Sequence, residues 1–211
     1  MKTKSKALLL TLCAVLLVAA SVLGTMAYLT STDSVENTFT VGSVAITLDE
    51  AKVNVNGQPV DKDGKVVDLK NAPRVDANAY KLMPGHKYTK DPTVHVAADS
   101  EDSWIFVKVE NGIYGYVVSS NKIEDQIAAN GWTALNGVAN VYYKAYTKTN
   151  TVTDLAVFGE FEIVDNADSV EGWGGLATAN VTVTAYAIQA DGFTDANAAW
   201  TAGGFGTTTG E

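Results

Sequence analysis

Short stretches in which apolar and polar residues alternate recur along most of this chain, and they constrain its fold more than any other feature. Alternation with a period of two is typical of strands that bury one face. Two dipeptides between such stretches, Asn56-Gly57 and Asp63-Gly64, favour the positive φ angles of tight hairpin turns. Strands are expected at 39–41, 44–48, 79–83, 88–97, 104–110, 113–118, 139–147, 156–164 and 181–190. Because Pro92 cannot donate to a ladder, its strand should be an edge strand or begin there.

Beyond residue 27, only two stretches predict helices. Asn121 can cap a helix, Glu124 completes a capping box, Ile123 and Ile127 lie four residues apart, and Gly131 can end the helix. A second helical turn is expected within 194–200. Many short strands with one or two short helices predict an all-β fold, a jelly-roll-type antiparallel β-sandwich.

The N-terminus is typical of a secretory signal peptide. Three lysines precede an apolar run over 7–23, and the small-x-small triplet from Thr25 to Ala27 follows it. Cleavage is therefore expected between Ala27 and Tyr28. An uncleaved membrane anchor is the alternative, although the apolar run is shorter than the roughly 20 residues that span a bilayer.

This cleavage site divides the chain into four expected parts. They are a signal-peptide helix over 1–27, an N-terminal arm over 28–38, the sandwich over 39–200, and a flexible tail rich in Gly and Thr over 201–211. Membrane contact is then expected only through the uncleaved signal peptide.

Loss of the signal peptide makes the mature chain strongly acidic. It takes away three of the 15 bases and none of the 24 acids, which leaves a formal charge of −12. Nucleic acids and anionic lipids are poor partners for such a surface. The same cleavage removes Cys13, the only cysteine, so the mature domain has no disulfide, thiol nucleophile or thiolate ligand.

Motifs for catalysis and for metal binding are missing from the sequence. The two histidines, His86 and His95, belong to no HExxH motif, and no GxSxG motif is present. We expect no catalytic residue, no metal and no cofactor. Asp99, Glu101 and Asp102 could bind calcium, but a solvated turn is the favoured interpretation of this cluster.

Four tryptophans could serve either the core or a ligand. Trp104, Trp132 and Trp200 are expected in the core, because large aromatics more often fill a disulfide-free sandwich than form a platform for sugars. Trp173 lies in the Gly-rich stretch EGWGGL and is the candidate contact for a ligand.

Four segments occur in a characteristic order along the chain. They are GTMAYLTSTDSVENTFTVGSVAITL around the cleavage site, LMPGHKYTKDPTVHV over 82–96, SWIFVKVEN from Ser103, and AYAIQADGF from Ala185 with Trp200 downstream. Together they resemble the TasA and camelysin family of exported bacterial proteins, whose signal peptides are removed by a dedicated signal peptidase, SipW. The resemblance covers most of the chain.

The resemblance implies a jelly-roll domain that is secreted to the cell surface and polymerises into fibres of a biofilm matrix. In TasA-like fibres the segment freed by cleavage inserts as a donor strand into the next subunit. By position, the donor here would run from Tyr28 to about Val35, with Tyr28, Leu29 and Val35 as buried side chains. The implied partners are further copies of the chain joined head to tail, a signal peptidase of the SipW type and, where the fibre is anchored, an accessory matrix protein.

Three alternatives stay open at this point. The arm lacks strict alternation between Thr30 and Ser34, so it could be a disordered N-terminus. The protein could instead be a monomeric module for cell-surface adhesion or glycan binding that uses Trp173. A camelysin-like metalloprotease is the third alternative, although nothing around the two histidines supports this activity.

Overall fold

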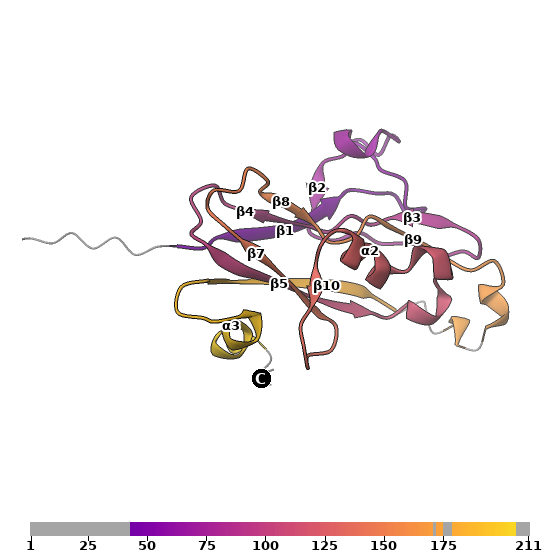
Figure 1. Ribbon diagram of the computed structural model, residues 1–211. Coiled ribbons are helices and arrows are strands. Elements are labelled where there is room, and N and C mark those ends of the chain that lie inside the picture. Colours follow the sequence, from indigo (N-terminus) through magenta and orange to yellow (C-terminus); the bar gives the residue numbers. More distant parts are fainter. Residues whose placement is uncertain (1–42, 171, 175–178, 206–211) are drawn as a thin grey trace, which may run out of the picture. The chain divides into compact units, whose positions relative to one another are not determined.

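Two four-stranded antiparallel sheets and a two-stranded ribbon make up the computed structural model, which describes residues 43–170, 172–174 and 179–205 (Figure 1). The first sheet has the order β2-β1-β4-β8, with strands Arg74–Val75 (β2), Ile46–Ala51 (β1), Thr93–Val96 (β4) and Asp154–Ala156 (β8). The second has the order β10-β5-β7-β6, with strands Val181–Gln189 (β10), Ser103–Asn111 (β5), Val141–Tyr146 (β7) and Thr133–Ala134 (β6). The ribbon pairs Lys87–Thr89 (β3) with Glu160–Glu162 (β9).

Short helices fill the connections between the strands. The α-helices are Ile123–Ala129 (α2) and Ala196–Ala202 (α3). The 3₁₀ helices are Leu69–Asn71 (η1), Tyr114–Tyr116 (η2), Ser119–Asn121 (η3) and Ala167–Ser169 (η4). The all-β class with a few short helices, predicted from the alternation, is confirmed, and the arrangement is consistent with a β-sandwich.

Strand β5 is the centre of the core because it is buried on both faces. Its residues Ile105, Val107 and Val109 belong to the main core cluster, together with Val94 from β4. Phe106, which points the opposite way, packs in a second cluster with Trp200 of α3. The main cluster therefore lies between the two sheets, and α3 covers the other face of the second sheet.

Two expected strands have other conformations. Residues 79–83 are extended but belong to no sheet: the Lys81 N–H donates to the Val55 carbonyl oxygen at 2.7 Å. Within 113–118 the chain forms η2 instead, and the buried Ile113 and Val117 lie on either side of this 3₁₀ helix, with Val117 in an isolated bridge to Ile163.

Two other expected strands are each divided between sheets. The stretch 88–97 separates into β3 and β4, and the prediction that Pro92 marks an edge or a strand start is confirmed, because β4 begins at Thr93. The stretch 156–164 separates in the same way around Val157 to Gly159, between β8 and β9. The expected strand over 39–41 lies outside the described residues.

Both predicted hairpin turns are present. Gly57 and Gly64 have φ angles of 75° and 84°, and antiparallel bridges flank the two turns. Gly57 also cannot carry a side chain for lack of space, since a Cβ atom there would lie 2.6 Å from the Cα of Tyr88. The turn thus lets the first hairpin pack directly on β3.

The two predicted helices exist, but their ends differ from the expected ones. Lys122, not Asn121, is the N-cap of α2, and the Glu124 carboxylate accepts from Asn111 at 2.9 Å instead of closing a capping box. Gly131 has the predicted positive φ, 80°. The second helix, α3, is capped by Asp195, whose carboxylate accepts from the Ala198 N–H.

The C-terminal end of the sandwich extends beyond the expected boundary at residue 200. Helix α3 continues to Ala202, and the Phe205 ring lies 4.9 Å from the ring of Tyr186 and 6.0 Å from that of Phe106. The first residues of the expected flexible tail are therefore packed against the second sheet. Residues 206–211 lie outside the described part.

Candidate functional site: the open edge beside β10

Strand β10 has one edge that no strand of the described residues covers. It pairs with β5 along its whole length, from Val181 to Gln189. The Gly112 N–H donates to the Asn180 carbonyl oxygen, and the Ala190 N–H donates to the Asp102 carbonyl oxygen. The even-numbered residues of β10 therefore point their backbone N–H and C=O groups toward β5. Backbone groups alternate in direction along an antiparallel strand, so the odd-numbered residues point theirs outward. These are Val181, Val183, Ala185, Ala187 and Gln189.

The side chains along this edge leave the core partly uncovered. Val181, Val183, Ala185 and Ala187 pack against the main core cluster, yet all four are only half-buried. Strand β1 lies next to β10 but pairs on its outer side only at its last two residues, with β2. Among the residues that the structure describes, no strand therefore lies between β10 and the first part of β1.

Two adjoining cavities follow this opening. The larger has a volume of about 680 Å³ and the smaller about 220 Å³. Both are lined by Asn78, Lys90, Asn180 and Val181, so they form one continuous depression, which we name the edge groove. Its apolar end is lined by Tyr80, Leu82, Ile113, Phe161, Trp173 and Ala179.

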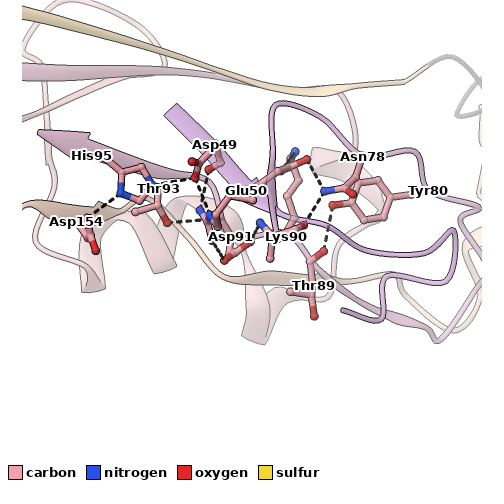
Figure 2. Close-up of polar contacts among 12 residues, drawn as sticks. Asp49, Glu50, Asn78, Tyr80, Thr89, Lys90, Asp91, Thr93, His95 and Asp154 are labelled. Atoms are coloured by element: carbon pink, nitrogen blue, oxygen red, sulfur yellow. Dashed lines mark hydrogen bonds and ion pairs between the residues drawn. The ribbon is translucent and has the colours of Figure 1, made fainter. Parts of the chain in front are cut away.

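A buried polar cluster lies at the junction of the two cavities. The Lys90 ammonium contacts the Glu50 carboxylate at 2.6 Å, and the Asn78 amide donates to the other oxygen of that carboxylate at 2.9 Å. Glu50 is only 3% exposed. Figure 2 shows the side chains of Lys90 and Asn78 pointing toward Glu50.

Tyr80 lies at the apolar end of the groove and is half-buried. Its hydroxyl donates to the Thr89 carbonyl oxygen at 3.1 Å. Burial first, and then the nearby Glu50 and Asp91 carboxylates, raise the pKa of Tyr80 well above its ordinary value. The phenol therefore stays neutral, and its hydroxyl acts as a hydrogen-bonding group while its ring packs against Phe161.

A second charged cluster links the strands of the first sheet (Figure 2). His95 contacts Asp154 through Nδ1 at 2.7 Å and Asp49 through Nε2 at 2.8 Å. Arg74 bridges Asp49 and Asp91, with both contacts at 2.6 Å. Partial burial opposes charge on His95, but the bonds to Asp154 and Asp49 prevail and raise the pKa of His95 above its ordinary value.

His95 should make the stability of the domain depend on pH. Because the folded-state pKa is raised, its contribution is fully present below the unfolded value of about 6.5 and is lost as pH rises through the folded pKa. Urea denaturation at about pH 5.5 and pH 9 should show the native chain losing on the order of 1 kcal/mol more than His95→Gln. Equal losses in the two proteins would contradict this role.

The structure describes only some of the site residues predicted from the sequence. Thr25, Ala27 and the donor residues Tyr28, Leu29 and Val35 lie outside the described residues. Trp173 lines the edge groove, with its ring 6.0 Å from that of Tyr116. Of the three expected core tryptophans, Trp132 and Trp200 are buried and Trp104 is half-buried.

Two residues of the acidic stretch that could have bound calcium, Glu101 and Asp102, contact Lys148 instead. Lys148 contacts Glu101 at 2.7 Å, and its backbone N–H donates to Asp102 at 2.7 Å. In the part of the chain that the structure describes, no three His, Cys, Asp or Glu side chains converge in a way that could hold a metal ion. No helix of the described residues is long and apolar enough to span a bilayer.

The polar cluster of Glu50, Asn78 and Lys90 was missed in the sequence, although one signal was available. Val44, Ile46 and Leu48 establish an alternation that places position 50 on the same inward face. A carboxylate at an inward position requires a partner. The partners themselves could not be found this way, because they lie in an irregular segment and in the connection between β3 and β4.

Comparison of the chain with known protein families, with curated proteins and with solved structures finds no match.

Proposed function

We propose that this chain is the secreted subunit of an extracellular matrix fibre, with a jelly-roll domain that polymerises by donor-strand exchange after signal cleavage. In this proposal the arm over 28–38 of one copy adds to the outer edge of β10 in the next copy. The observation that carries the proposal is the uncovered β10 edge with its half-buried apolar side chains and adjoining groove.

The length of the proposed donor segment matches the length of the open β10 edge. Strand β10 offers nine residues of edge, and an extended donor of about ten residues reaches roughly 33 Å. Strand addition gains main-chain hydrogen bonds along the edge and apolar contacts in the groove. The half-buried Val181, Val183, Ala185 and Ala187 would lose their remaining exposure to water beneath such a strand.

At the larger cavity of the groove, whose charged lining residues are both lysines, the charges are also complementary. The arm over 28–38 carries Asp33 and Glu36 and no base. The exposed Lys81 lines the groove, where it can meet either carboxylate. Such a contact sets orientation more than affinity.

Assembly by this route is head to tail, because the donor and the acceptor are different surfaces of the chain. A heterologous contact that does not close into a ring generates a filament. Cleavage by a signal peptidase of the SipW type would release the arm, and an accessory matrix protein would anchor the fibre at the cell surface. The protein has no enzymatic activity in this proposal.

Removing the arm should abolish fibre formation. Negative-stain electron microscopy of the chain beginning at Tyr28 should show filaments, whereas the same chain lacking residues 28–38 should remain monomeric. Circular dichroism of the shortened chain should retain its β-sheet signal, because the deletion leaves in place every residue of the two described core clusters.

Filaments from both forms would rule out the arm as donor. Monomers from both would favour the second candidate function, a glycan-binding or adhesion module. The specific observation in its favour is Trp173, which lines the groove beside the polar side chains of Asn78 and Asn180. Aromatic faces with nearby amides suit a sugar ring.

A further inference from the structure

The buried cluster at the floor of the edge groove combines three groups that can react with one another. Lys90 provides an amine, Asn78 a carboxamide, and Glu50 a carboxylate that contacts both. The three residues come from separate segments: Glu50 from β1, Asn78 from the irregular chain after β2, and Lys90 from the connection between β3 and β4. The two nitrogens lie against the two oxygens of a single carboxylate (Figure 2).

Little solvent reaches the Glu50 and Lys90 side chains of the cluster. The side chains of Glu50 and Lys90 are only 4% and 12% exposed. The 2.6 Å contact gives a proton of the Lys90 ammonium a direct path to the Glu50 carboxylate. The transfer leaves a neutral amine on Lys90, which is a nucleophile.

The Asn78 amide is held as an electrophile. Its Oδ1 accepts from the Val53 N–H at 2.8 Å, and its Nδ2 donates to the Ala51 carbonyl oxygen at 2.8 Å as well as to Glu50. The N–H of Val53 would stabilise negative charge that develops on Oδ1 when Cγ is attacked. The amide is thus fixed in orientation by three hydrogen bonds, one of which activates its carbonyl.

We propose that Lys90 and Asn78 join in an intramolecular isopeptide bond, with Glu50 as the catalytic proton carrier. Glu50 accepts a proton from the Lys90 ammonium, and the freed amine attacks Cγ of Asn78 to form a C–N bond. Glu50 passes that proton to Nδ2 and takes a second proton from the attacking nitrogen. The bond between Cγ and Nδ2 breaks, and the ammonia that leaves accepts the second proton from Glu50. The ammonium and the carboxamide become one secondary amide plus an ammonium ion, so no oxidant or other reactant is required.

Two neighbouring residues serve as matched comparisons. Lys81 and Asn180 also line the edge groove. Within the described residues neither side chain contacts a buried carboxylate, and Lys81 is exposed. They have the same chemical groups in the same groove without the proton carrier, so they should not react.

The crosslink would close a loop from residue 78 to residue 90 and fix the chain that lines the groove. Its formation needs only the folded domain and does not depend on polymerisation. Failure of the crosslink would therefore leave the proposed fibre function untouched, and monomeric behaviour would leave the crosslink untouched.

Intact-mass spectrometry of the purified native protein tests the proposal. The protein should be lighter than its sequence requires by the mass of one ammonia. Trypsin should then yield a branched peptide that joins residues 75–81 to residues 88–108, because the modified Lys90 is no longer cleaved. Glu50→Gln and Lys90→Met should both have the unmodified mass, whereas Lys81→Met should lose ammonia as the native chain does.

Ammonia can also be lost by succinimide formation at an Asn-Gly dipeptide such as Asn56-Gly57. Such a succinimide hydrolyses at alkaline pH, gives no branched peptide and does not depend on Lys90. Equal ammonia loss in the native protein and in Lys90→Met, with no branched peptide from the native protein, would therefore overturn the proposal. So would a folded native protein with the full sequence mass and separate, unbranched peptides, and that result requires no variant to fold.

Discussion

Ala185→Pro should abolish fibre formation while the domain stays folded. The Ala185 N–H points to the outer edge of β10 and not to β5, so proline removes no hydrogen bond of the existing sheet. Proline is tolerated on an edge strand when its missing N–H faces outward. An incoming donor strand, however, would lose a hydrogen bond and meet the proline ring.

The matched control lies one residue earlier in the same strand. Thr184 faces β5 with its backbone groups, so Thr184→Pro removes a ladder hydrogen bond and leaves its acceptor on β5 unpaired. The free energy of unfolding should fall by about 1–3 kcal/mol. Electron microscopy and urea denaturation of both variants separate the two effects. Normal filaments from Ala185→Pro would exclude this edge as the acceptor.

Phe106→Ala should cause the largest loss of stability among single changes to the core. Phe106 is fully buried on β5, and its ring lies 5.2 Å from that of Trp200 and 6.0 Å from that of Phe205. Truncating such a side chain costs about 3–5 kcal/mol through lost burial and the cavity left behind. Domains of ordinary stability have roughly 5–15 kcal/mol in total.

Equilibrium urea denaturation measures this loss. Tyr114→Ala is the control, because Tyr114 is 59% exposed and its removal should change the free energy of unfolding by no more than about 0.5 kcal/mol. A loss below about 1 kcal/mol for Phe106→Ala would mean that α3 and the C-terminal aromatics do not pack on β5 in solution. Filament formation is not needed for this measurement.

The long strands of the second sheet could be predicted from alternation alone. Strands β5 and β10 fill both faces of a sheet with the expected period of two, and each is within one residue of its predicted bounds. The stretches 79–83 and 113–118 alternate as well but form no ladder. Alternation reports which side chains face the core. In the first stretch the residues that line the groove meet this requirement, and in the second Ile113 and Val117 do, on either side of a 3₁₀ helix.

The candidate site was less accessible to prediction. The open edge of β10 depends on which strand lies at the end of the sheet, and that order follows from pairing between segments far apart in sequence. The role of Lys90 depends on Glu50, forty residues earlier. A single lysine or a single glutamate belongs to no sequence motif that would mark it as part of a site. Trp173 could be singled out because an aromatic side chain in a Gly-rich stretch is unusual, and it does line the groove.

The central pairing of β5 with β10 also has a kinetic consequence. It joins residues 103–111 to residues 181–189, so the sheet cannot close until almost the whole chain has been synthesised. Domains dominated by such distant pairings fold slowly, in milliseconds to seconds. A nascent chain of this kind therefore lacks its central pairing until residue 189 has been made. A protein exported as proposed needs that delay, because it must reach the translocation channel before its sheets form.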